Sequence, residues 1–108
     1  MQDHFNGLTP AEAERLAMLA EEAAKVVQVV GKILRHGYSG YHPDRPHISN
    51  RGLLMNELAD LKAVQFLMEG SGDIFCMSDK IEHALAEHAL VRKLTYTHHQ
   101  GDCNVKVL

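Results

Sequence analysis

Two short acidic motifs contain the residues of this sequence that are best suited to chemistry. Glu21 and Glu22 are adjacent within EEAAK, and Glu57 and Asp60 lie one helical turn apart within ELAD. Mg²⁺ prefers carboxylate oxygens and keeps coordination positions for water and for substrate phosphates. Acids that converge from two helices therefore suggest a magnesium site. The alternative is a network of interhelical salt bridges, which also prevents charged side chains from being buried alone.

The helical period predicts that these acids do converge. At about 100° per residue, Glu22 falls inside the apolar arc of one helix and Glu57 inside that of another, while Asp60 lies beside the second arc. The first arc contains Leu16, Leu19, Ala23, Val26, Val29, Val30 and Ile33, and the second contains Leu53, Leu54, Leu58, Leu61, Val64 and Met68. A carboxylate in such a position needs contact with water at the edge of the interface, a basic side chain as partner, or a bound cation. Arg15 and Lys25 are the bases closest in sequence to the first motif.

Three helices are predicted to position the acids. The first spans roughly 9–36: Thr9 to Glu12 form a capping box with Pro at the first helical position, and Gly37 offers a left-handed stop. The second spans roughly 50–69 and begins with Ser49 or Asn50 as its cap. The third spans roughly 78–97. Residues 37–49 between the first two helices are rich in Gly and Pro and are predicted to form a loop.

The length and the three helical patterns predict one all-α domain over residues 1–108. It ends in a tail, 98–108, whose VKVL either pairs as a short strand or stays loose. The chain is 45% hydrophobic and 23% charged but only 6% aromatic, so aliphatic residues must build its core. The predicted architecture is an antiparallel bundle of three to four helices, completed by oligomerisation. The apolar face of the second helix opposite Glu57 is the candidate subunit contact. It comprises Met55, Ala59 and Phe66.

Charge and hydropathy exclude some partners. The formal net charge is −3 and no basic run exists, so a nucleic-acid partner is not expected. Charged residues interrupt every apolar stretch, so no membrane span is expected either. Cys76 and Cys103 lack metal-ligand spacing and suggest reduced thiols in a cytoplasmic protein.

The two acidic motifs also resemble a known family. EE-x-x-K at 21–25 followed by E-x-x-D at 57–60 is similar to the EExxE…ExxD signature of the all-α nucleoside triphosphate pyrophosphohydrolases, the MazG-like family. The surrounding segments, LTPAEAERLAMLAEEAAKVVQVVGKILRHGY, NRGLLMNELADLKA and KLTYTHHQ, extend the resemblance over roughly residues 8–100. It points to the small single-domain branch carried by bacteriophages and their hosts.

The resemblance implies an activity and assigns roles to the acids. It implies that the chain hydrolyses a nucleoside triphosphate to the monophosphate and pyrophosphate with Mg²⁺, or alternatively Mn²⁺, in the cytoplasm of a bacterium or of a phage-infected cell. Glu22, Glu57 and Asp60 would be metal ligands, and Glu21 would be a ligand or would orient the attacking water. The resemblance further implies a homodimer or homotetramer.

Lys25 departs from the family pattern, which has an acid at this position. A protonated lysine cannot bind Mg²⁺, and it can pair with Glu22 or reach Asp60. Three interpretations follow: an enzyme with one weakened metal site, a catalytically inactive protein that binds nucleotides or acts in regulation, and a structural relative without a ligand.

Further basic residues are candidates for substrate binding. Lys32, Arg35 and His36 gather near the end of the first helix and are predicted, with Lys25, to contact phosphate or base. Their alternative role is to complement the helix dipole. Lys93, near the end of the third helix, could close over the site or belong to a solvated terminus.

Overall fold

The structure is a computed structural model that describes residues 6–76 and 78–100. The chain divides into two compact units, Met1–Ile74 and Phe75–Leu108, and each is described here by itself. The described residues form three helices and no strand, which confirms the predicted all-α class. The first unit contains α1 (Pro10–His36) and α2 (Asn50–Gly70), and the second contains α3 (Asp79–Leu94).

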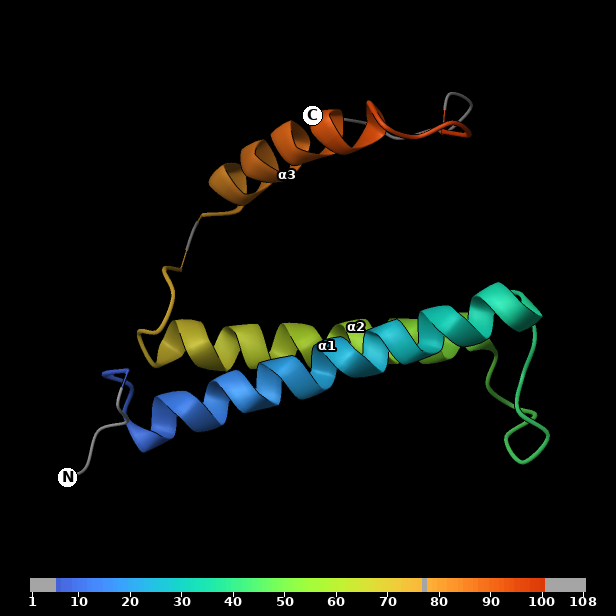
Figure 1. The fold of residues 1–108 in the computed structure, drawn as a ribbon, viewed down its shortest axis with the longest axis horizontal. Helices are drawn as coiled ribbons and strands as arrows, with labels where there is room; N and C mark the ends of the chain where they lie inside the picture. The colour runs from blue at the N-terminus through green and yellow to red at the C-terminus, as the bar shows by residue number, and fades with distance from the viewer. Residues whose placement is uncertain (1–5, 77, 101–108) are drawn as a thin grey trace. The chain divides into compact units, whose positions relative to one another are not determined.

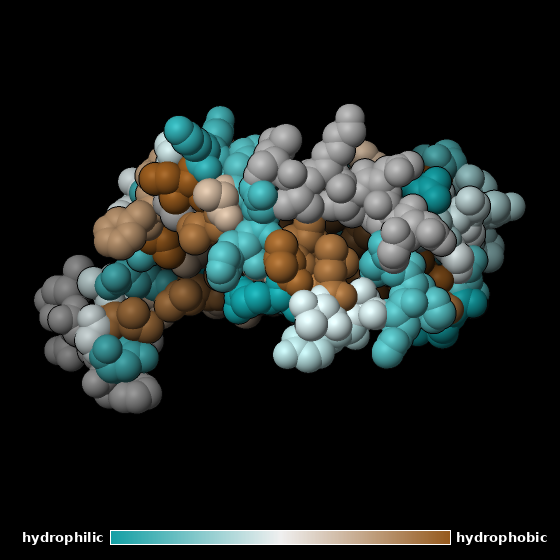
Figure 2. Space-filling view, turned by 90° about the horizontal axis from the view of Figure 1, so that it is seen from above, coloured by the Kyte–Doolittle hydropathy of each residue, from teal (hydrophilic) through white to brown (hydrophobic). Residues whose placement is uncertain are grey.

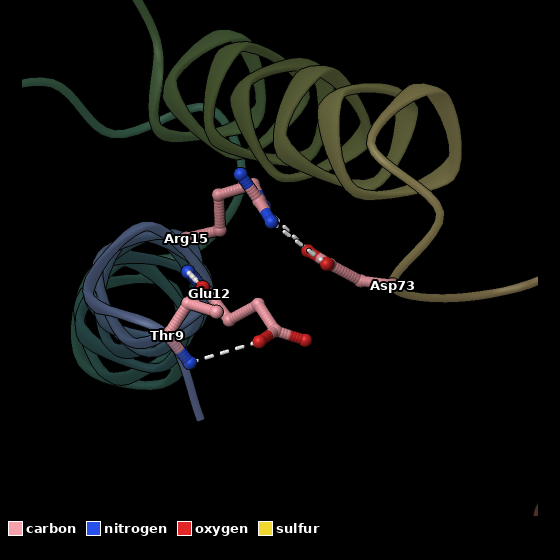
Figure 3. Close-up of polar contacts among 4 residues, drawn as sticks. All are labelled: Thr9, Glu12, Arg15 and Asp73. Carbon is pink, nitrogen blue, oxygen red and sulfur yellow. Dashed lines mark hydrogen bonds and ion pairs between the residues drawn. The ribbon is translucent and has the colours of Figure 1, made fainter. Parts of the chain in front are cut away.

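The ends of α1 are those that its sequence predicts. The Thr9 hydroxyl accepts a hydrogen bond from the Glu12 backbone N–H at 3.1 Å, and the Glu12 carboxylate accepts one from the Thr9 N–H at 2.9 Å (Figure 3). This reciprocal capping box satisfies two amides that have no partner within the helix. At the other end Gly37 has φ +81°, and its N–H donates to the Ile33 carbonyl at 2.7 Å. A side chain at Gly37 would strain this backbone conformation.

The start of α2 distinguishes between two candidate caps. The Ser49 hydroxyl accepts from the Gly52 N–H at 3.1 Å, so Ser49 is the cap. Asn50 has a different role from the predicted cap: it is buried, and its Nδ2 donates to the Gly37 carbonyl at 3.1 Å. Its backbone N–H donates to the Gly40 carbonyl at 2.7 Å. Asn50 therefore ties the start of the loop to the start of α2.

The helices α1 and α2 form an antiparallel hairpin that positions the two acidic motifs (Figure 1). Among the described residues, the apolar core consists of Val29 from α1 with Val64 and Met68 from α2. Full burial of such a side chain stabilises a fold by about 1.5–3 kcal/mol. This core is small, with three buried apolar side chains among the described residues.

A polar contact closes the end of the hairpin opposite the loop. Arg15 Nη2 donates to Asp73 Oδ1 at 2.9 Å, and Arg15 Nε donates to Asp73 Oδ2, so the pair is bidentate (Figure 3). The Asp73 N–H also donates to the Met68 carbonyl at 2.9 Å, just beyond the end of α2. The hydrogen bonds from Arg15, together with its charge, lower the pKa of Asp73. Arg15 thus pairs with Asp73 and is not the base that compensates the acidic motifs.

The described residues of the second unit form one helix, and its start agrees with the prediction. The Ser78 hydroxyl accepts from the Ile81 N–H at 3.3 Å and caps α3. The helix ends at Leu94 instead of at about 97, because the chain turns there and the Thr97 hydroxyl donates to the Leu94 carbonyl at 2.9 Å. None of the residues 79–94 is buried. The predicted behaviour of VKVL lies outside the described residues.

Candidate metal centre and adjoining groove

The hairpin brings three of the predicted site acids together. Glu22 comes from α1, and Glu57 and Asp60 come from successive turns of α2. One carboxylate oxygen from each residue lies within 4.8 Å of the others. The helical period directs each acid to the facing surface, and the antiparallel pairing sets the two motifs at the same height.

Two oxygens of this cluster are buried without a partner. Glu22 Oε2 and Glu57 Oε2 are shielded from solvent and accept no hydrogen bond from any described residue. An unsatisfied buried acceptor costs about 1–3 kcal/mol, and more when it is charged. Asp60, in contrast, is exposed and leaves the cluster open to solvent. Hard oxygen ligands in this arrangement fit a divalent cation such as Mg²⁺, which would satisfy the buried oxygens and retain water on its open side.

Lys25 neutralises part of the cluster. Its Nζ lies 3.4 Å from Glu22 Oε1 and 3.6 Å from Glu21 Oε1. The pKa of Lys25 is raised, first by the charge of Glu22, next by the hydrogen bond to it, and then by the charges of Glu21 and Glu57. Both ion pairs lie within α1. Across residues 6–76, the ion pairs of Lys25 are with acids of α1, and none joins it to Asp60.

Glu21 lies outside the cluster. Its side chain is 67% exposed, and the contact that positions it is the ion pair with Lys25. The predicted role of Glu21 in orienting water therefore stays a prediction.

A cavity of about 500 Å³ adjoins the cluster. It lies between the two helices and the 37–49 loop. Its lining residues are Lys25, Gln28, Val29 and Lys32 from α1, Leu53 and Glu57 from α2, and His42, Asp44 and Arg45 from the loop. Because Glu57 belongs both to the cluster and to this first cavity, a molecule in the cavity would lie beside the cation site. Three lysine and arginine side chains in the lining favour an anionic ligand.

A second cavity of about 620 Å³ continues the first. The two cavities adjoin, because Lys32, His42 and Leu53 line both, and we refer to them together as the groove. The remaining lining of the second cavity consists of Arg35, His36, Gly40, Tyr41, Pro43 and Asn50. The groove therefore runs from carboxylates, past cations, to a segment with an aromatic ring.

The groove contains most of the basic residues predicted to bind substrate. Lys25 and Lys32 line the first cavity, and Arg35 and His36 line the second with Lys32. Lys93 belongs to α3, in the unit that is described separately, so its role stays a prediction.

Sequence reasoning missed the contribution of the loop. Tyr41, His42 and Arg45 line the groove, although the segment was predicted only to be a connection. A usable signal was present, because this connection combines two tyrosines with basic residues, and binding residues concentrate on loops held by rigid elements. Gln28, one turn beyond Lys25, was missed as well.

Hydrogen bonds to the hairpin hold the loop in place. The Arg51 N–H donates to the Tyr38 carbonyl at 3.0 Å, beside the two bonds made by Asn50. Gly40 permits this close approach, because a Cβ there would lie 2.7 Å from the His36 carbonyl oxygen. The groove is thus largely formed before any ligand binds, as is usual for small-molecule sites.

Comparison of the chain with protein-family models, with curated proteins and with solved structures found no match. None of the described helices combines the length and the apolar character needed to cross a bilayer.

Proposed function

We propose that this protein is a MazG-like, Mg²⁺-dependent nucleoside triphosphate pyrophosphohydrolase, for which Mn²⁺ can replace Mg²⁺. One observation carries the proposal: buried, unpartnered carboxylate oxygens of Glu22 and Glu57 lie beside a groove lined with cations. A divalent ion would provide a partner for the buried oxygens, and a polyphosphate would pair with the cations of the groove. A nucleoside triphosphate brings both to one place, because it binds as a complex with Mg²⁺.

In this proposal Glu22, Glu57 and Asp60 hold the ion. A bound divalent cation neutralises phosphate charge and lowers the pKa of a coordinated water. The chain itself positions the substrate. Lys25 and the cations of the first cavity bind phosphate oxygens, which fixes the α-phosphorus for attack.

The reaction breaks one bond and forms one. The oxygen of water adds to the α-phosphorus, the bond from this phosphorus to the bridging oxygen of the β-phosphate breaks, and pyrophosphate leaves. Glu21 is the proposed residue that orients the water and accepts its proton, since its carboxylate is exposed and adjoins Glu22.

Charge supports one metal ion instead of two. The three clustered carboxylates and the Lys25 ammonium leave a formal charge of −2. One divalent ion balances this charge, whereas a second would be repelled by the ammonium and by the first ion. Lys25 then supplies a fixed positive charge toward the phosphates.

A specific observation favours a second candidate, a catalytically inactive protein that binds nucleotides or acts in regulation. The Lys25 ammonium already contacts Glu22 Oε1, which competes with a metal ion for that carboxylate. In this case the same groove would bind a phosphorylated nucleotide without hydrolysing it.

Pyrophosphate release from a panel of canonical, deoxy and damaged nucleoside triphosphates, with Mg²⁺ or Mn²⁺, tests the enzyme. Turnover by the wild type supports the proposal. Nucleotide binding by calorimetry without any product would support the inactive protein instead. Absence of both product and binding heat would refute both candidates.

We further propose that the working form is a homodimer or homotetramer. The first unit buries few apolar side chains and exposes many. Those that are large and exposed are Leu16, Met18, Val27, Val30, Leu34, Tyr38, Tyr41, Met55, Leu58, Phe66, Leu67 and Ile74. Figure 2, which draws both units, colours hydrophobic residues brown, and several of them lie on the visible surface. A second copy that covers Met55 and Phe66 of α2 would remove apolar surface from water. A cytoplasmic location belongs to the same proposal.

A further inference from the structure

We propose that the second cavity is a nucleoside subsite in which Tyr41 and His42 of the loop recognise a heteroaromatic base. The loop would then determine which nucleotide is selected. This inference rests on the proposed function and deepens it. It assigns base recognition to the second cavity, which takes no part in the reaction at the metal.

The acid cluster gives the ligand its direction, because cations line both cavities and only the first cavity contains Glu57 of the cluster. Lys25 and Glu57 mark the end nearest the acid cluster, and Arg45 adds a third cation to the first cavity beside Lys25 and Lys32. An anionic chain is stabilised there by cations and by the metal. Since Lys32 and His42 also line the second cavity, a ligand whose phosphates occupy the first cavity extends directly into the second.

The second cavity has the lining that a base requires. Tyr41 is 58% exposed at its wall, so its ring is accessible to a ligand, and Pro43 and Leu53 add apolar surface. Stacking on an aromatic ring suits any base, because every base has a π-face. Phosphate gains nothing from the apolar surfaces of Tyr41, Pro43 and Leu53, although the cations Lys32 and Arg35 also line this cavity.

His42 is prepared to donate a hydrogen bond. The Asp44 N–H donates to His42 Nδ1 at 3.1 Å, which favours the neutral tautomer with its hydrogen on Nε2, while the Asp44 carboxylate lies farther from Nδ1, at 3.7 Å. The Arg45 N–H donates to the His42 carbonyl at 2.8 Å and fixes the turn between these residues. An N–H with a fixed tautomer can distinguish between the acceptor atoms of different bases, whereas the ring of Tyr41 provides stacking.

Two probes separate the subsites. Inorganic tripolyphosphate carries the anionic chain without a base, and α,β-methylene analogues of the common nucleoside triphosphates carry both and resist cleavage at the α,β position. Calorimetry of the full chain with Mg²⁺ measures each affinity. We expect the wild type to bind at least one analogue about tenfold more tightly than tripolyphosphate, the difference that a stacked base supplies.

The variants have opposite expected signatures. Tyr41→Ala should weaken the preferred analogue about tenfold and leave tripolyphosphate unchanged within about twofold. His42→Gln should lower the affinity for the same analogue only. Arg45→Gln should lower the affinity for both probes by the same factor. His47→Gln is the matched control, because His47 is an exposed histidine of the same loop that lines neither cavity.

The possible outcomes distinguish failure of the nucleoside subsite from failure of the proposed function. Equal affinity of the wild type for tripolyphosphate and for every analogue would overturn the nucleoside subsite and leave the metal and phosphate site standing. Tyr41→Ala and His42→Gln that weaken neither probe, or both probes alike, would also overturn it. Failure of the wild type to bind either probe would overturn the proposed function and the subsite together. Unchanged circular dichroism establishes that each variant is folded.

Discussion

Lys25 Nζ lies 3.4 Å from Glu22 Oε1, one helical turn away on α1. This ion pair puts a fixed positive charge beside the oxygens that would hold a divalent cation. Glu22 Oε2 nevertheless remains buried and unpartnered, so the ammonium satisfies only one side of the carboxylate. The residue limits how much positive charge the cluster can accept, but it does not occupy the cluster.

Glu57→Gln should abolish metal-dependent turnover and weaken Mn²⁺ binding by more than about tenfold, a loss that even outer-shell partners of a metal produce. The amide removes a charged ligand and relieves an unpartnered buried carboxylate, so the melting temperature without metal should not fall. Electron paramagnetic resonance of free Mn²⁺ and thermal melts provide the measurements.

Glu69→Gln is the control for this variant, because Glu69 lies on α2 outside the cluster. Unfolding of Glu57→Gln would indicate a structural role for Glu57. Undiminished Mn²⁺ binding would contradict the metal centre.

Lys25→Glu should change the number of metal ions bound. The substitution takes the formal charge of the four side chains from −2 to −4, which two divalent ions can balance. Without metal, Glu21 and Glu22 lose their common cation and gain a third carboxylate beside them, so the melting temperature should fall; added Mn²⁺ should restore it. Metal titrations should give one ion per chain for the wild type and two for Lys25→Glu.

Lys25→Gln separates charge from shape in this experiment, since it removes the ammonium without adding a ligand. It should bind a single ion, as the wild type does, but with higher affinity. Two ions bound by the wild type would contradict the role assigned to Lys25.

The Arg15–Asp73 pair should make stability depend on acidic pH. The pKa of Asp73 in the folded protein is lowered from its ordinary 3.8 by the hydrogen bonds and charge of Arg15. A depressed pKa contributes stability that is fully present above the unfolded value and is lost as the pH falls through the folded value. Asp73→Asn should therefore be less stable than the wild type near neutral pH, and the difference should shrink below 3.8.

Thermal melts across this pH range measure the difference. In an Arg15→Gln background, Asp73→Asn should add little, because the partner is already lost. A stability difference that stays constant as the pH falls would show that the two side chains do not share this linkage.

Gly40→Ala should disturb the loop without touching the acid cluster. The added Cβ would lie 2.7 Å from the backbone carbonyl of His36 and 3.1 Å from Asn50 Nδ2. Relief requires movement of backbone, which typically costs about 1–3 kcal/mol. Denaturant unfolding should detect this loss, and affinity for the nucleotide analogues should fall while Mn²⁺ affinity is retained.

Gly70→Ala provides the comparison, since a Cβ at Gly70 meets nothing within 4 Å. It should leave nucleotide affinity unchanged. Equal behaviour of the two variants would contradict the close approach at Gly40.

Phe66→Glu should dissociate the proposed oligomer. Phe66 is 59% exposed on α2, and a buried charge in an apolar interface is strongly unfavourable. Sedimentation velocity should show a dimer or tetramer for the wild type and a smaller species for the variant. Asn56→Asp adds a charge to the same helix at a position about 80° around it from Phe66, and should leave the oligomer intact. A monomeric wild type would refute the proposal.

Local patterns were sufficient to predict the helices and the faces that their acids occupy. The capping box at Thr9 and the stop at Gly37 involve hydrogen bonds that span at most four residues. The helical period likewise turned Glu22 and Glu57 toward the packing surface, because side-chain direction repeats with the helix. The end of α3 was predicted three residues late, since its last turn contains no glycine that would mark a stop.

The partners of individual side chains depended on the tertiary structure. Arg15 pairs with Asp73, 58 positions away in the sequence, and the loop places Arg45 in the groove. Such contacts follow from the register and spacing of two packed helices, which no window of neighbouring residues contains. Sequence alone thus determined the helices and the inward direction of the acids. The pairing of α1 with α2 decided which oxygens meet and which remain unpartnered, because only packing brings distant residues within hydrogen-bonding range.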